Sequence, residues 1–379
     1  MKDSPASRTD LLGLPLPQLA AALEPFVDRP FRARQIFDAL YRRHQTDFAA
    51  MTEISAELRR TLAERFELAL PEISGRERAA DGTTKYLLRL RDGASIETVD
   101  IPDRHRRTLC LSSQAGCALG CAFCVTGFWG GGRDLSAAEI VGQVELVRRH
   151  ADLPEAVNLV FMGMGEPLLN LESLRDALEV LSTTISLRRV TVSTAGVVPG
   201  IHALALWPRR PNLAVSLHAP DDERRGEIMP IQRKWPLAEL MRALRAFPLE
   251  PRRRITFEYI LLAGFNDRLA DADALARRLR GIPSKVNLIP FNPDPVLPDW
   301  MRRPDEAAVE RFRDRLEQHR MTATVRRQRG HEVAAACGQL RAFARAPRGR
   351  PAPKNLAAPR TSRSTAPETT AGAVVPAPR

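Results

Sequence analysis

Apolar and polar residues follow a repeating strand-then-helix pattern over most of the chain. From residue 109 onward, six short apolar runs typical of buried strands are each followed by a stretch with apolar residues at helical intervals. The runs are LCLSSQ (109–114), AVNLVFM (156–162), RVTVSTA (189–195), NLAVSLHA (212–219), ITFEYILL (255–262) and KVNLIPF (285–291). The helices are expected from Ser136, from about Asn170, near residue 200, over 236–247, from Asp267 and from Pro304. This alternation predicts parallel strands covered by helices, in a doubly wound sheet or a β/α barrel.

The N-terminal part has a helical pattern of its own. Residues 31–44 and 55–68 place apolar side chains at helical intervals, and Ser55 is a suitable N-cap. Two strand-like runs, TKYLLRL (84–90) and ASIETVDI (94–101), follow and are joined by the turn RDG. We therefore predict a small helical N-terminal domain, residues 1–80, and a larger α/β domain, residues 81–344.

The last part of the chain differs in composition. Residues 345–379 are rich in Pro, Ala, Ser and Thr without an apolar period, which predicts a disordered tail. The chain has 57 Lys and Arg against 45 Asp and Glu, a net charge of +12, of which +6 lies in this tail. The remaining excess favours a polyanionic partner such as nucleic acid, although a single basic cluster is more often a solvated surface.

The N-terminus does not read as a leader, and no apolar run approaches the ~18 residues of a membrane span. We expect a cytoplasmic protein with reduced thiols and no membrane association. Three of the five cysteines, Cys117, Cys121 and Cys124, lie within CALGCAFC, directly after the first strand. Structural zinc usually takes four ligands from two separated pairs, whereas three thiolates on a [4Fe-4S] cluster leave one iron open. The missing fourth ligand favours the cluster.

This Cys-x-x-x-Cys-x-x-Cys spacing, after the first strand of a β/α array, resembles the signature of radical S-adenosylmethionine (SAM) enzymes. In that superfamily the open iron binds SAM, and an electron from the cluster cleaves it to a 5′-deoxyadenosyl radical. FMGMGEPLLN (161–170) resembles the superfamily's GGEP element. Further stretches, among them TLCLSSQAGCALGCAFCVTG, SLHAPDDERR, KVNLIPFNP and AAACGQL, closely resemble the RlmN family of RNA methyltransferases over roughly residues 10–343.

The resemblance implies a partial (β/α)6 barrel with a helical accessory domain, using a [4Fe-4S] cluster and SAM. Its substrates would be adenosine 2503 of 23S rRNA and adenosine 37 of certain tRNAs, methylated at C2. The electron donor would be a flavodoxin or ferredoxin, and we expect a monomer. The residues implied in SAM binding lie at the ends of four predicted strands. They are Gly165, Glu166, Ser193, Ser216, Leu217, His218 and Asn292.

The family's chemistry gives a role to the other two cysteines. C2 of adenine is electron-poor and is not a nucleophile, so one SAM methylates a cysteine, here Cys337, and a second SAM supplies the radical that activates this methyl group. Cys110 then resolves the covalent RNA adduct by removing the C2 proton and forming a disulfide with Cys337. Glu97 occupies the place of the family's proton acceptor. Without the resemblance, Cys110 and Cys337 would read as small buried apolar residues.

Two features depart from the family pattern. The segment GFWGGGRDL is glycine-rich and carries Trp129 where relatives have a basic or polar residue, and the basic tail is extra. Two other functions stay open: Cfr-type methylation at C8 of the same rRNA adenosine, and a non-catalytic iron–sulfur protein that binds RNA.

Overall fold

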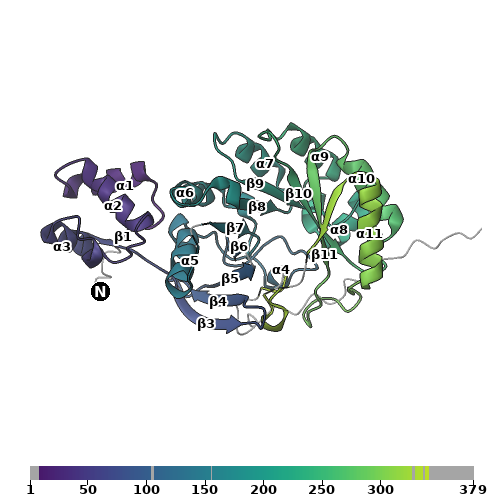
Figure 1. Ribbon diagram of the computed structural model, residues 1–379, viewed down its shortest axis with the longest axis horizontal. Helices are drawn as coiled ribbons and strands as arrows, with labels where there is room; N and C mark the ends of the chain where they lie inside the picture. Colours follow the sequence, from purple (N-terminus) through teal and green to yellow (C-terminus); the bar gives the residue numbers. More distant parts are fainter. Residues whose placement is uncertain (1–7, 104–105, 155, 327–328, 336–337, 341–379) are drawn as a thin grey trace, which may run out of the picture.

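A single large sheet dominates the computed structural model, which describes residues 8–103, 106–154, 156–326, 329–335 and 338–340 (Figure 1). Within these residues ten strands follow the order β12-β11-β10-β9-β8-β7-β6-β5-β4-β3, so every strand pairs with its neighbour in sequence. Pairs from β3 to β6 are antiparallel and pairs from β6 to β12 are parallel. The strands are β3 (Glu72–Arg78), β4 (Thr84–Arg89), β5 (Ser95–Asp103), β6 (Arg106–Cys110), β7 (Val157–Phe161), β8 (Val190–Thr194), β9 (Asn212–Ser216), β10 (Ile255–Leu261), β11 (Ser284–Pro290) and β12 (Thr322–Val325).

This strand order decides between the two predicted architectures. A doubly wound sheet reverses its order at a switch point, and no reversal occurs between β6 and β12. The fold is therefore an open β/α barrel, as the resemblance implied, and its parallel part is longer by one strand. β12 was not predicted, because four residues with alternating exposure do not stand out in a sequence.

The helices cover the outer face of the parallel strands (Figure 1). All six predicted helices are present, and α5 begins with a capping box in which Ser136 and Glu139 bond each other's main chain. Two short helices, α4 and α8, were not predicted. The helices of this region are α4 (Val125–Trp129), α5 (Ala137–His150), α6 (Leu171–Leu181), α7 (Val198–Ala205), α8 (Asp222–Ile228), α9 (Leu237–Ala246), α10 (Leu269–Leu279) and α11 (Glu306–Gln318).

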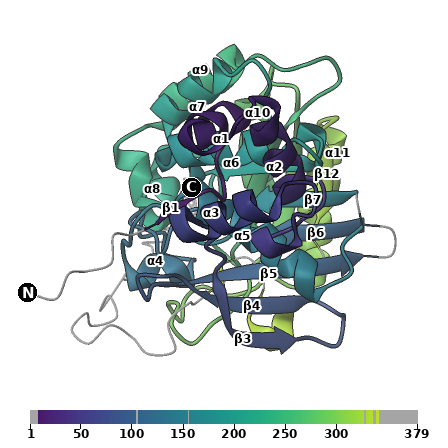
Figure 2. The ribbon, with the colours of Figure 1, turned by 90° about the vertical axis from the view of Figure 1, so that its left-hand side faces the viewer.

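The N-terminal helices form a separate lobe beside α5 and α6 (Figures 1 and 2). They are α1 (Leu16–Leu23), α2 (Phe31–Tyr41) and α3 (Ala56–Arg65), with a small parallel pair of strands, β1 (Thr9–Asp10) and β2 (Phe66–Glu67). The helix predicted over 55–68 is too long, because Phe66 leaves helical geometry and packs edge-on against Phe26, with ring centroids 5.2 Å apart. The helix predicted over 31–44 likewise ends early, at Tyr41.

This lobe contacts the barrel through polar and close main-chain contacts. His44 Nδ1 lies 2.9 Å from a carboxylate oxygen of Glu145 in α5, and Gln18 donates to Asp176 in α6. A Cβ added to Gly13 would lie 2.3 Å from the main-chain nitrogen of Ala138, so the chain entering the lobe runs directly against the start of α5. No helix among the described residues is long and apolar enough to cross a membrane.

Candidate active site

Three cysteine side chains line one cleft at the carboxyl ends of the parallel strands. The segment between β6 and α4 carries all three: Cys117, Cys121 and Cys124. In β/α barrels the active-site residues lie in such loops, which follow the carboxyl ends of the strands. The cleft holds about 900 Å³ of space when its open mouth is included. Its wall also includes Gly165, Glu166, Ser193, Ser216 and His218, so the structure brings most of the predicted site residues together.

The cysteine segment is held by close main-chain contacts on both sides. Cys117 N–H donates to the Gly130 carbonyl at 2.9 Å, and Ala122 N–H donates to the carbonyl of Ile228 at the end of α8 at 2.9 Å. A Cβ on Gly132 would lie 1.5 Å from the Ala115 carbonyl oxygen, so only glycine fits there. The glycine-rich stretch that departs from the family pattern thus packs directly against the cysteine segment.

The donor set fits a thiolate-ligated cluster. The cysteines among the described residues form no disulfide with one another. Burial raises the pKa of Cys117 to about 12 and raises the pKa of Cys121 and Cys124 as well. A bound metal centre reverses this effect, because coordination deprotonates a thiol outright. In the described part of the chain, no group of three His, Cys, Asp or Glu side chains surrounds a single metal-ion position. A cluster does not require such a group, because each of the three thiolates binds a different iron.

Glu166 supplies a buried carboxylate to the cleft. One oxygen accepts from Ala195 N–H at 2.7 Å and the other from Leu168 N–H at 3.1 Å, which ties the turn after β7 to the end of β8. Burial raises the pKa of Glu166 to about 7. A positively charged partner in the cleft would favour the ionised form.

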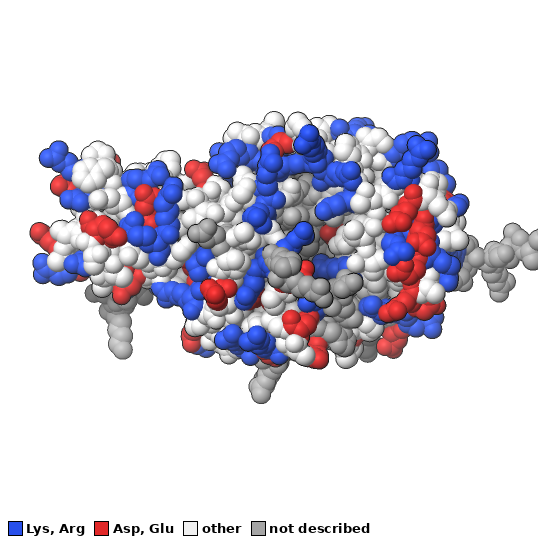
Figure 3. All heavy atoms as spheres, viewed as in Figure 1, with Lys and Arg blue, Asp and Glu red and all other residues white. Residues whose placement is uncertain are grey.

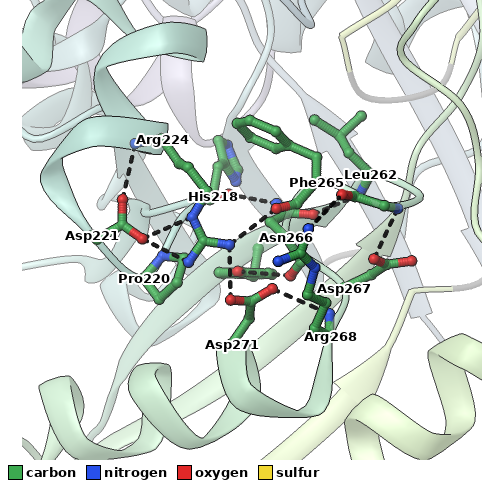
Figure 4. A network of polar contacts seen from close by, with 12 residues as sticks. His218, Pro220, Asp221, Arg224, Leu262, Phe265, Asn266, Asp267, Arg268 and Asp271 are labelled. Carbon is green, nitrogen blue, oxygen red and sulfur yellow. Dashed lines mark hydrogen bonds and ion pairs between the residues drawn. The ribbon is translucent and has the colours of Figure 1, made fainter. Parts of the chain in front are cut away.

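His218 enters the cleft as a neutral ring with a defined tautomer. Its Nδ1 accepts from Ile260 N–H at 3.1 Å, so the ring proton lies on Nε2. Burial, and secondarily the charge of Arg225, lowers the pKa of His218 to about 3. Asn266 fixes the surrounding main chain by donating to the carbonyls of His218 and Ile260 (Figure 4). His218 also packs edge-on against Phe123, with ring centroids 4.6 Å apart.

Two predicted SAM contacts lie outside the cleft wall. The Leu217 side chain is fully buried, and its carbonyl accepts from Arg225. Asn292 is 8% exposed, and its buried Oδ1 has no hydrogen-bond partner among the described residues. An unsatisfied buried acceptor is costly, which is consistent with a ligand donor at this position.

Cys110 and Glu97 lie on one face of the neighbouring strands. Val99 pairs with Cys110, and because side chains two residues apart point to the same side, Glu97 shares that face. Lys85 is on this face too, with its Nζ 3.3 Å from a Glu97 carboxylate oxygen.

Cys337 lies outside the described residues, and so does the predicted tail. The residues that follow Cys337 are placed at the cleft: Gly338 and Leu340 line it, and the Gly338 carbonyl accepts from Val125 N–H at 2.7 Å. Thr126 Oγ1 donates to the Leu340 carbonyl at 2.9 Å.

Sequence reasoning missed two buried charged residues at this site. Glu258 of β10 lines the cleft, where Asn287 donates to its carboxylate at 2.7 Å and burial raises its pKa. A carboxylate inside the apolar run ITFEYILL was a visible signal of this position. Arg225 lies behind the cleft wall and is 1% exposed. Its neighbours in DDERR give no sign that it is buried.

Comparisons with known proteins agree with this geometry. Residues 111–277 match the Radical SAM superfamily, and residues 9–68 match the "Ribosomal RNA large subunit methyltransferase N-terminal domain". A relative from Halorhodospira halophila, named dual-specificity RNA methyltransferase RlmN, is 50% identical over 338 residues, covering 87% of this chain and 93% of the relative. The chain belongs to the RlmN family. A relative of the same name from Anaeromyxobacter dehalogenans is 48% identical, with coverages of 88% and 92%.

A solved structure extends the agreement to three dimensions. A radical SAM methyltransferase from Sphaerobacter thermophilus matches with a TM-score of 0.83 and 43% identity, covering 88% of this chain and all of that one. Membership in the family confirms the predicted fold class and implies a [4Fe-4S] cluster and SAM as cofactors.

Proposed function

We propose that the protein is an RNA methyltransferase that methylates C2 of adenosine 2503 in 23S rRNA and of adenosine 37 in tRNAs. Cys337 carries the methyl group, and each turnover consumes two molecules of SAM. One observation carries the proposal: three thiols, a buried carboxylate and a neutral imidazole meet in a cleft that Gly338, the neighbour of Cys337, also lines.

In this proposal each side chain has a defined task. When bound, the cluster and SAM supply the one-electron cleavage that produces a hydrogen-abstracting radical. Cys117, Cys121 and Cys124 hold the cluster. The SAM residues are Gly165, Glu166, Ser193, Ser216, Leu217, His218 and Asn292. Among them Glu166 supplies a carboxylate that accepts from an ammonium, His218 an Nε2–H donor and Asn292 an amide acceptor.

The remaining tasks belong to the second pair of cysteines. In the release step the Cys110 sulfur forms a disulfide with the Cys337 sulfur as the bond from that sulfur to the methylene carbon breaks, and the methylene carbon takes up a proton to become the methyl group of the released base. In the step before it, Cys110 removes the C2 proton of the RNA adduct. Glu97 takes up the proton, and Lys85 holds its carboxylate in place at 3.3 Å. Cys110 and Glu97 share one face of the sheet, which supports their acting on the same adduct.

The surface supports an RNA substrate. Lys and Arg side chains gather around the middle of the face drawn in Figure 3, and over the N-terminal lobe they lie between Asp and Glu side chains. In the lobe the exposed arginines are Arg8, Arg29, Arg34, Arg42, Arg43, Arg60 and Arg65, of which Arg34, Arg42 and Arg43 form ion pairs with carboxylates of the lobe. We propose that residues 1–80 form an RNA-binding accessory domain, that residues 81–344 form the catalytic core, and that residues 345–379 form a basic tail. We further propose a cytoplasmic monomer that receives electrons from a flavodoxin or ferredoxin.

Mass mapping of 23S rRNA and tRNA from cells with and without the gene tests the function. The expected result is the loss of 2-methyladenosine at position 2503 of the rRNA and at position 37 of tRNAs. Loss of 8-methyladenosine from the rRNA would assign the C8 reaction instead. An unchanged methylation pattern in both RNAs would favour the non-catalytic RNA-binding function.

A further inference from the structure

Arg225 is a buried cation that binds main-chain carbonyls instead of a carboxylate. Its guanidinium donates to the carbonyls of Ala195 at 2.6 Å, Ser216 at 3.1 Å and Leu217 at 3.1 Å, and to Gln232 Oε1 at 2.6 Å. No carboxylate among the described residues forms an ion pair with Arg225. Gln232, which accepts from Arg225, donates in turn to the carboxylate of Asp222, so this carboxylate contacts Arg225 only indirectly. A buried charge without a counter-charge is strongly unfavourable, so Arg225 requires negative charge from another source.

The neighbouring Arg224 shows the contrast on the same helix. Arg224 forms ion pairs with Asp221 at 2.6 Å and with Asp271 at 2.7 Å (Figure 4). Its charge is neutralised by these two carboxylates. The two arginines therefore differ in counter-charge although they are adjacent in sequence.

The cysteine segment is a candidate for the missing counter-charge. α8 is joined to this segment by the bond from Ala122 N–H to the Ile228 carbonyl, one residue from Cys121. Cys121, like Asp222, acts electrostatically on Arg225, while burial lowers the pKa of Arg225 to about 10. A cluster bound by three thiolates carries net negative charge, and one-electron reduction makes that charge more negative by one unit.

We propose that Arg225 is a positioning residue with two tasks: its buried charge stabilises the reduced cluster, and its hydrogen bonds fix the ends of β8 and β9 that form the SAM rim. The second task follows from its three carbonyl partners: Ser216 and Leu217 are themselves proposed SAM residues, and Ala195 lies two residues after Ser193. The inference rests on the proposed cluster site. It goes beyond the proposed function because it assigns a residue that sets the reduction potential.

The test is an EPR-monitored redox titration of the anaerobically reconstituted full chain, without SAM, using a low-potential chemical reductant. Arg225→Met should lower the equilibrium constant for one-electron reduction at least tenfold, which is a shift of about 59 mV to more negative potential. Arg225→Lys keeps the charge and should stay near the wild-type potential. Because lysine cannot reproduce the guanidinium's carbonyl contacts, this variant should still bind SAM at least tenfold more weakly.

Arg233→Met is the matched control, because Arg233 is an exposed arginine of the turn that follows α8, and it should leave the potential unchanged. If Arg225→Met has the wild-type potential, the electrostatic task is wrong. If Arg225→Met retains no cluster, the Arg225→Lys variant decides the question. A cluster retained in Arg225→Lys supports the role of the positive charge. A cluster lost in Arg225→Lys shows that only the packing of the arginine side chain matters. If wild-type protein binds no iron, the proposed function itself fails, so the two failures are distinguishable.

Discussion

The turn at Gly165 offers a sharp test of the SAM site. Gly165 has φ +95°, a conformation that residues with a side chain rarely adopt. A Cβ at this position would lie 2.4 Å from Gln114 Cβ and 2.7 Å from the Gln114 main-chain nitrogen. In Gly165→Ala the turn must therefore move, and Glu166, whose N–H donates to Gln114 Oε1 at 2.8 Å, moves with it.

The Gly165→Ala substitution has two energetic effects, one on the stability of the fold and one on the affinity for SAM. The positive φ alone costs roughly 1–2 kcal/mol of stability for alanine. Displacing the Glu166 carboxylate also removes a charged hydrogen bond to the SAM ammonium, and such bonds contribute about 1.5–3 kcal/mol. The affinity for SAM should therefore fall roughly 10- to 100-fold.

The assay is SAM binding to anaerobically reconstituted protein by equilibrium dialysis, normalised to iron content. Gly93→Ala is the control, because Gly93 has φ +83° in the turn between β4 and β5 and an added Cβ would meet open space. It carries similar backbone strain and should bind SAM as the wild type does. If Gly165→Ala binds SAM within twofold of Gly93→Ala, the assignment of Glu166 to the SAM site is wrong.

Three further predictions address resolution, packing and pH. Cys110→Ala should accumulate a covalent protein–RNA adduct, seen as a nuclease-sensitive band on a denaturing gel; normal turnover without adduct would contradict its resolving role. Gln143→Leu should lower the free energy of unfolding by about 3 kcal/mol or more in urea titrations, because the fully buried Gln143 satisfies Ser112 N–H, the Ser112 carbonyl and the Thr98 hydroxyl. Because the pKa of His218 is lowered from 6.5 to about 3, only the unfolded chain takes up this proton, so stability is lost as pH falls below 6.5. His218→Gln should flatten the dependence of thermal stability on pH between 6.5 and about 3, and a dependence as steep as that of the wild type would refute the neutral ring.

The six β/α units could be predicted because each depends on a local pattern. Every apolar run overlaps a strand, although the strand expected over 109–114 begins earlier, at Arg106, and ends at Cys110. The capping pair Ser136 and Glu139 marks the start of its helix. The choice between barrel and doubly wound sheet depends on which strands pair, and the sequence alone carries no local signal for that. The resemblance supplied it, and the consecutive order from β6 to β12 agrees.

The parts of the site that depend on the spacing of residues in the sequence could be predicted. The parts that depend on contacts between remote residues could not. The cysteine spacing and the Gly-x-Gly-Glu turn were visible in the sequence. The tautomer of His218 depends on Ile260, and the burial of Arg225 depends on carbonyls from two strand ends. Such contacts between remote residues form only in the folded chain.

The isotope content of the product tests directly whether the methyl group passes through Cys337. Reconstituted protein would be incubated with RNA, a reductant and SAM whose methyl group carries three deuterium atoms, and the methylated adenosine would be analysed by mass spectrometry. A methyl group that loses one hydrogen on Cys337 before it bonds to C2 predicts 2-methyladenosine with two of the three deuterium atoms retained. Retention of all three deuterium atoms would show direct methyl transfer from SAM to the RNA and would contradict the route through a methylated Cys337.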